Sequence, residues 1–574
     1  MSATPLVRDE PMAAGAAARI RPLSMGGVGA RRRYAPVMAL YVLATLFTDA
    51  HFMADTEDFA RQVVDLCNGI PHPWDPGHLF WQPLGALAFR AFRPLVQALV
   101  GPDMRLGVTW TLLALAWAAG LVAVLSLRGL LASVGVRDGI ADLVVAAFVF
   151  SHGFLNFAQA GPPYVAGLAA LMLGLFLLAR AATGAGPSWP AAVAGGACLA
   201  SAVCLWFPYV LTVPAAVVSP VFFKGADRKR ARIVLQAALF AALVAGVAYG
   251  LAAADLGIST IGGFREWLLE SRHGTENRGV ARMVFGLGRS FVSMGDYGML
   301  FKRFLLHDPY NPVSLGALLR SSLWALALFH LVLVSIAVRL LRSADQRRIL
   351  ALAALGSLPL LAFAAHFDGG AIERYLPLYP FVFLAHASSL QSRPLSLSGA
   401  ATVALVAVAS MANASGMRST TLAREQEEAA ARMRAVVMRA RPMSRVFAVN
   451  WQDDLVNFRR SFPLHDLNRR ADLRITSLVT PGTAQAAGWR SEFARLALET
   501  WQEGGDVWIS TRALSPRPRA EWNWVEGADP HLTWPEFPRF FSALEMGERA
   551  GGEDGFLRLP PTPGNEHALR AEAR

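Results

Sequence analysis

The sequence predicts an α-helical polytopic membrane protein that carries an α/β domain at its C-terminal end. Hydrophobic residues make up 54% of the 574 residues, charged residues only 17%, and the mean hydropathy is +0.36. Apolar runs recur throughout residues 34–412, and a run of roughly 20 such residues spans a bilayer. From residue 413 onward the composition is mixed and the segments are short. The chain therefore divides into a membrane part and a C-terminal part.

The chain is basic, with a formal net charge of +12. Its basic residues gather in short clusters between the apolar runs, most clearly in KGADRKRAR at 224–232. Lys and Arg in such loops stay on the cytoplasmic side, so the charge indicates membrane topology and we expect no nucleic-acid partner. Residues 1–33 are expected to be a disordered basic cytoplasmic tail, and the first helix, 34–47, leads outward.

The next segment, 48–83, is acidic: TDAHFMADTEDFARQVVDLCNGIPHPWDPGHLFWQP. Carboxylates at a membrane face cost desolvation unless they are hydrated, paired or used, so we interpret this segment as the rim of an active site. Residues 54–68 have apolar side chains at helical spacing, which predicts an amphipathic surface helix. Residues 79–100 are apolar but contain Arg90 and Arg93, and we expect a second interfacial helix that does not cross.

The remaining membrane helices follow from apolar runs and from the basic clusters that separate them. Together with the first helix they give about 11 spans by the length criterion. The long loop 255–312 is expected to lie outside and to form surface helices. The further expected spans are 106–127, 140–157, 165–178, 191–206, 209–223, 233–253, 321–341, 349–365, 376–390 and 398–411.

The C-terminal region, 413–574, is expected to be a small α/β domain outside the membrane. A charged helix is predicted at 418–441, strands in RVFAVNWQ, LRITSLVTP and DVWISTRAL, and a helix at 491–502. The region has no glycine-rich loop, metal-ligand spacing or nucleophile motif. Its tryptophans could stack on sugars, but core packing and interfacial anchoring together are the stronger explanation.

Three motifs resemble the C-type superfamily of integral-membrane glycosyltransferases, which includes protein mannosyltransferases and aminoarabinose transferases. ADTEDFARQ at 54–62 is similar to that superfamily's acidic first outer loop, and GIPHPWDPGHLFWQPLG at 69–85 to the run that follows it. ERYLPLYP at 373–380 is similar to its Arg-Tyr-x-x-Pro run. The resemblance covers 34–412 and implies transfer of a sugar from a polyprenyl-phosphate donor. The second outer loop departs from the pattern, since FAQAGPPY lacks the acidic residue often found before its tyrosine.

The resemblance implies a carboxylate base for the acceptor and a cation for the departing phosphate. Asp55 is the expected base; Asp58, one turn on, could share the role, and Asp49 is the rival. Arg374 is the expected phosphate ligand because its fork matches phosphate oxygens. The other residues assigned to substrate binding are Glu373, Tyr375, His72, His78 and Trp74.

Structural explanations compete with each of these roles. Asp55 could simply be a helix N-terminal charge favoured by the helix dipole, and Arg374 an interfacial arginine. His72 and His78 could bind phosphate or a divalent cation, although loop histidines more often hydrogen-bond backbone. The sequence predicts no metal-ligand set and no required cofactor.

The predicted function is transfer of a sugar to an envelope or extracytoplasmic acceptor, which could be a glycan, a lipid or a protein. The expected location is the inner (plasma) membrane, with the N-terminus cytoplasmic. Two other functions stay open: a transporter or flippase for lipid-linked sugars or small solutes, and a non-catalytic scaffold for envelope assembly. A transporter would place charges near the bilayer midplane and use paired broken helices.

Overall fold

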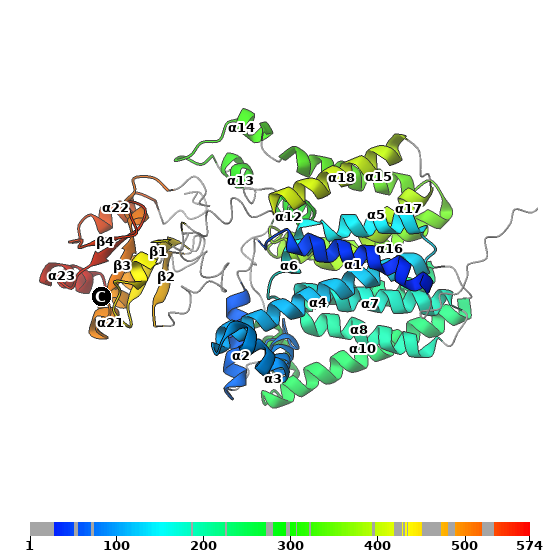
Figure 1. The fold of residues 1–574 in the computed structure, drawn as a ribbon, viewed down its shortest axis with the longest axis horizontal. Coiled ribbons are helices and arrows are strands. Elements are labelled where there is room, and N and C mark those ends of the chain that lie inside the picture. Colours follow the sequence, from blue (N-terminus) through cyan, green and yellow to red (C-terminus); the bar gives the residue numbers. More distant parts are fainter. Residues whose placement is uncertain are drawn as a thin grey trace, which may run out of the picture.

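A computed structural model gives a helical bundle and, beyond one end of it, a unit built on a β-sheet (Figure 1). The structure describes residues 28–50, 55–70, 74–184, 188–223, 227–270, 279–293, 299–305, 307–320, 323–392, 397–417, 428, 431–432, 434–450, 472–479, 488–518 and 533–573. His72 and most of the expected charged helix 418–441 lie outside these residues.

The helices of the first 416 residues follow the expected apolar runs closely, with differences at their ends. They are α1 (Val28–Leu46), α2 (Thr56–Cys67), α3 (Trp81–Val100), α4 (Met104–Ser133), α5 (Asp138–Val149), α6 (His152–Phe157), α7 (Tyr164–Thr183), α8 (Trp189–Leu205), η1 (Phe207–Leu211), α9 (Val213–Val218), η2 (Ser219–Phe222), α10 (Asp227–Asp255), α11 (Ile261–Glu270), α12 (Val280–Phe291), α13 (Met299–Leu305), α14 (Leu315–Arg320), α15 (Leu323–Leu340), α16 (Ala344–His366), η3 (Glu373–Leu378), α17 (Tyr379–Ser392) and α18 (Leu397–Gly416).

Among the described residues, four helices are long and apolar enough to cross a membrane, and shorter apolar helices accompany them. The long ones are Met104–Ser133, Tyr164–Thr183, Arg228–Asp255 and Ala344–His366. The protein is thus a polytopic membrane protein.

The expected span 209–223 is wrong as a single helix. The chain there forms η1, α9 and η2 in succession, with prolines at positions 208, 214 and 220. Each proline lacks a backbone N–H donor and its ring clashes with the preceding turn, so regular α-helix cannot continue through all three. Residues 140–157 are likewise divided, between α5 and α6.

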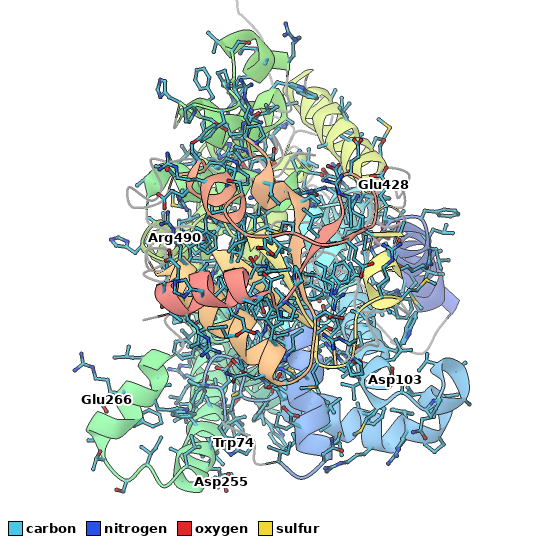
Figure 2. All side chains as sticks on the ribbon, turned by 90° about the vertical axis from the view of Figure 1, so that its left-hand side faces the viewer. Trp74, Asp103, Asp255, Glu266, Glu428 and Arg490 are labelled. Atoms are coloured by element: carbon cyan, nitrogen blue, oxygen red, sulfur yellow. The ribbon has the colours of Figure 1, made fainter. Side chains whose placement is uncertain are left out.

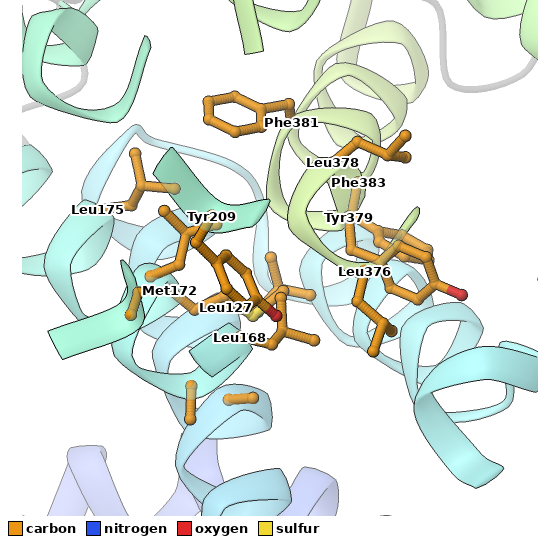
Figure 3. Close-up of a cluster of buried hydrophobic side chains, with 14 of the residues drawn as sticks. Leu127, Leu168, Met172, Leu175, Tyr209, Leu376, Leu378, Tyr379, Phe381 and Phe383 are labelled. Carbon is orange, nitrogen blue, oxygen red and sulfur yellow. The ribbon is translucent and has the colours of Figure 1, made fainter. Parts of the chain in front are cut away.

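Helix α7 lies at the centre of the bundle, packed between α4 and α8. Glycines let these helices approach closely: a Cβ atom at Gly174 would lie 2.8 Å from Leu199, and one at Gly196 would lie 2.5 Å from the Ala237 carbonyl oxygen. Figure 3 shows the apolar side chains that fill this region, including Leu168 and Met172 of α7 and Tyr209 of η1. Small residues at helix contacts are typical of membrane bundles, where close packing replaces the hydrophobic driving force.

The C-terminal unit contains a five-stranded sheet in the order β2-β1-β3-β5-β4. Strands β1 (Arg445–Asn450), β2 (Arg474–Val479) and β3 (Val507–Ser510) are parallel, and β5 (Phe556–Leu559) and β4 (Arg549–Ala550) extend the sheet with antiparallel pairings. Helix α21 (Trp489–Gln502) connects β2 and β3; η6 (Thr511–Leu514), α22 (Glu536–Phe541) and α23 (Pro563–Glu572) complete the unit. Trp489, Trp508 and Trp534 are buried, so these three serve the core.

The sheet unit lies at the same end of the bundle as α2 and α3 (Figure 1). A direct contact comes from the segment between α13 and α14, where Tyr310 packs against the core of the sheet unit and Asn311 Nδ2 donates to the Pro518 carbonyl at 3.3 Å. The acidic segment and the C-terminal unit therefore share one side of the molecule.

Helix α3 has one face buried against the bundle and an opposite apolar face exposed. Trp81 and Phe89 are buried, whereas Leu87, Leu95 and Leu99 are exposed. Arg90 does not point toward that exposed face; its Nη2 donates to the Leu66 carbonyl at 3.0 Å. An apolar face with its arginine tied to a neighbouring helix is typical of a helix lying along an interface.

We predict that α3 lies along the membrane surface and does not cross it. A cysteine introduced at Pro102, in a variant from which Cys67, Cys198 and Cys204 have been removed, should react with a membrane-impermeant maleimide in intact cells. A cysteine at Arg342, in the basic cluster after α15, is the control and should react only after permeabilisation. Protection at position 102 would show that α3 crosses.

Candidate active site

Asp55 directly precedes α2 and occupies its N-cap position, yet its side chain makes no capping hydrogen bond. Its Oδ2 instead accepts a hydrogen bond from the Tyr164 hydroxyl at 2.5 Å, from a residue 109 positions away. The side chain of Asp55 is otherwise exposed. The dipole explanation for this carboxylate is therefore incomplete, because a tertiary contact and not the helix holds its oxygen.

The start of α2 is fixed by the loop that precedes α7. The Gly161 backbone N–H donates to Thr56 Oγ1 at 3.0 Å, and Trp81 Nε1 donates to the Gly161 carbonyl at 3.0 Å. A Cβ atom at position 161 would lie 2.5 Å from Thr56 Cγ2, so only glycine permits this approach. The uncharged loop FAQAGPPY thus serves as the surface on which the acidic segment rests.

Tyr164, the first residue of α7, is enclosed by aromatic rings. Its ring meets Phe157 edge-on at a centroid distance of 5.0 Å and lies 4.8 Å from Trp206 and 6.5 Å from the His78 ring. The Tyr164 carbonyl accepts from the Tyr209 hydroxyl at 2.7 Å. Aromatic packing of this kind fixes the direction in which the Tyr164 hydroxyl points.

Arg374 reaches the same place from η3. Its guanidinium carbon lies 5.9 Å from the centroid of Trp206 and 5.5 Å from that of Phe367, within the range of cation–π attraction. Its Nε is buried and has no hydrogen-bond partner among the described residues. A half-buried arginine with an unused, buried Nε donor, held between aromatic rings, is suited to binding an anion.

Glu373 adds a second carboxylate beside Asp55. The Glu373 side chain is half-buried. Loss of water around its carboxyl group raises the pKa of Glu373 to about 7. The Arg374 charge and a backbone hydrogen bond oppose the rise, while the carboxylates of Asp55 and Asp368 add to it. Asp55, Glu373 and Arg374 therefore form one electrostatic group.

The loop before α3 contributes His78 and Trp74. His78 Nδ1 lies 2.8 Å from Asp75 Oδ2, and its Nε2 is buried without a hydrogen-bond partner among the described residues. Trp74 is held from α10, since its Nε1 donates to Asp255 Oδ2 at 2.6 Å, and the two residues lie together in Figure 2. His78 faces the Tyr164 ring, whereas the indole N–H of Trp74 is used by the scaffold.

Three expected site residues have other surroundings. Tyr375 is fully buried, and its hydroxyl lies 2.6 Å from the Gly369 carbonyl and 2.8 Å from that of Met283, so it holds the loop before η3. Asp58 is exposed on α2 without a hydrogen bond given to its carboxylate within the described chain. Asp49 is exposed, and its backbone N–H donates to Met417. Of the candidate bases, Asp55 has the most specific contact.

Sequence reasoning missed Tyr164 and Trp206 as members of this group. Tyr164 is the tyrosine that ends FAQAGPPY, but no residue near it in the sequence marks it as a partner of Asp55. Within the described residues, no group of three or more His, Cys, Asp or Glu could hold a metal ion. The residues that gather here are suited to acid–base chemistry and anion binding.

No protein-family model matches the chain, and neither does any curated protein. Among solved structures, ArnT from Cupriavidus metallidurans bound to undecaprenyl phosphate is similar, with a TM-score of 0.50 and 10% sequence identity over 95% of this chain and 99% of that one. The same protein in the apo state also has a TM-score of 0.50, over 92% and 97% of the two chains. The chain has the fold of the C-type glycosyltransferases.

A third similar structure is the Archaeoglobus fulgidus oligosaccharyltransferase in its apo form, with a TM-score of 0.48, 12% identity and coverage of 87% of this chain and 72% of that one. The two ArnT structures confirm, at the level of the fold, the resemblance expected from the three motifs. Within this C-type fold, the acidic segment and ERYLPLYP lie together in space, since the charges of Asp55, Glu373 and Arg374 all act on Tyr164.

We predict that Glu373 changes its charge near neutral pH. Infrared spectra of the purified protein should contain a protonated carboxyl band below pH 7 that is lost as the pH rises through about 7. Glu373→Gln should remove this band, and Glu266→Gln on the exposed part of α11 should leave it. A band that persists in Glu373→Gln would assign the titration to another residue.

Proposed function

We propose that this protein is a membrane glycosyltransferase that moves a sugar from a polyprenyl-phosphate-linked donor to an extracytoplasmic acceptor. The observation that carries the proposal is the joint placement of an accessible carboxylate, Asp55, and a half-buried arginine with an unused Nε donor, Arg374, around Tyr164. The C-type fold and the undecaprenyl phosphate named for the similar ArnT structure support the donor class.

In the proposed reaction an acceptor hydroxyl attacks the anomeric carbon of the donor sugar. Asp55 accepts the hydroxyl proton as the new carbon–oxygen bond forms. The bond between that carbon and the phosphate oxygen breaks, and the phosphate leaves with the electron pair, which inverts the configuration. Arg374 stabilises the charge that develops on the departing phosphate, and we propose that His78, whose buried Nε2 has no partner among the described residues, contributes there.

We further propose that the site faces the extracytoplasmic side of the inner membrane. The domain limits proposed are a cytoplasmic tail at 1–33, the membrane transferase domain at 34–412 and an extracytoplasmic α/β domain at 413–574. The contact of Asn311 with Pro518 supports a common side for the long loop and the C-terminal domain. That domain lies where it can meet an acceptor outside the membrane.

One observation favours a transporter as the second candidate function. The segment from η1 to η2 is broken within the bundle, and discontinuous helices are a feature of transporter binding sites. Loss of sugar transfer without loss of lipid-linked sugar movement in an Asp55 variant would support the transferase. The reverse result would support the transporter.

Asp55→Asn keeps the size of the side chain and removes its charge. We predict that it lowers transfer from radiolabelled polyprenyl-phosphate sugars by about 10²–10⁴-fold, because that is the usual contribution of a positioned base. Donor binding should persist, since the base acts on the acceptor. Asp58→Asn, one turn along α2, is the matched control and should keep most activity. Equal losses in both variants, or greater loss in Asp58→Asn, would contradict the assignment.

Arg374→Ala should weaken donor binding as well as transfer, because it removes a charge-assisted contact worth roughly 1.5–3 kcal/mol. Arg374→Lys should rescue only in part, since an ammonium lacks the guanidinium fork and its stacking on Trp206 and Phe367. The measurement is the affinity of each purified variant for a polyprenyl phosphate, compared with that of the unmodified protein. Unchanged donor affinity in Arg374→Ala would show that another group holds the phosphate.

A further inference from the structure

Tyr164 connects the two halves of the proposed site. Its hydroxyl donates to Asp55, its ring lies 4.8 Å from that of Trp206, and Trp206 in turn lies against the Arg374 guanidinium. These residues come from the start of α2, the start of α7, the end of α8 and η3. The row Asp55–Tyr164–Trp206–Arg374 therefore sets the spacing between the base and the phosphate ligand.

Tyr164 is itself held firmly. Its side chain is 6% exposed, and Phe157 and Trp206 pack against its ring. Its backbone is tied at two levels, because it begins α7 and its carbonyl accepts from Tyr209. Asp55, by contrast, lies at the exposed end of a surface helix, where its side chain could populate several rotamers without this contact.

The hydrogen bond affects the two oxygens of Asp55 differently. Oδ2 receives the Tyr164 hydroxyl, whereas Oδ1 has no hydrogen bond to a residue that the structure describes. A donor on Oδ2 fixes the plane of the carboxylate. The oxygen left over, Oδ1, is then presented to an acceptor hydroxyl in a single orientation, and orientation of this kind lowers the barrier to reaction.

We propose that Tyr164 is a positioning residue of the transfer reaction, which keeps its own proton and holds the Asp55 carboxylate aimed at the acceptor. This inference rests on the proposed function. The second outer loop, FAQAGPPY, has no carboxylate, and the inference assigns its part in the reaction to the Tyr164 hydroxyl. Tyr164 acts through Asp55 and does not exchange a proton with the substrate.

The test is Tyr164→Phe, which keeps the ring and deletes the hydroxyl. We expect kcat for transfer to fall about 10–100-fold, as for loss of a hydrogen bond to a charged group, while KM for the donor changes less than about threefold. Tyr41→Phe deletes another buried hydroxyl, which donates to the Trp117 carbonyl at 2.7 Å, and should leave both kcat and KM unchanged.

A second variant keeps the inference testable if Tyr164→Phe folds poorly. Asp55→Glu retains a carboxylate but moves it relative to Tyr164, and should lower kcat by a similar factor. Where both fold, the double variant should lose little more than either single one, because they remove the same contact. Additive losses, or a kcat for Tyr164→Phe that matches that of Tyr41→Phe, would overturn the inference. Absence of transfer by the unmodified protein would instead overturn the proposed function.

Discussion

The geometry of the site depends on the contact between the start of α2 and the loop before α7. The Gly161 N–H donates to Thr56 Oγ1, and the Gly161 carbonyl accepts from Trp81 Nε1. Thr56 comes so close that no side chain fits at position 161. These contacts bring the acidic segment onto the central helix of the bundle, so that Asp55 meets Tyr164. The apolar face of α2 packs on the bundle through Phe59 and Val63, and the contact with Gly161 fixes where the start of the helix lies.

The bundle also gives the charged side chains of Glu57 and Arg374 different surroundings. Glu57, the acidic neighbour of Asp55, pairs with Arg105 of α4 and turns away from Tyr164. Arg374 is held by aromatic rings and not by a carboxylate contact at close range, which leaves its Nε without a partner among the described residues. A guanidinium that is already paired would bind an anion less strongly. The buried Nε–H without a partner costs free energy that a bound anion would offset.

The similarity to ArnT at 10% identity shows how little sequence this fold requires. Bundle helices need apolar side chains and small residues at their contacts, and many sequences satisfy both conditions. The positions that carry chemistry are subject to narrower requirements of distance and direction. Three short motifs could therefore indicate the fold although no family model matches the chain.

The sequence by itself determined the membrane character and the positions of most helices, because apolar run length and charge are local properties. The association of the acidic segment with ERYLPLYP was expected only from the resemblance of their motifs to one superfamily. The sequence could not show that residues 209–223 break into short helices, since three prolines can also end or kink a span in other ways. Nor could it identify Tyr164 as the partner of Asp55. That contact joins residues 109 positions apart and depends on Gly161, on Trp206 and on the direction of a buried ring, which only the packed structure decides.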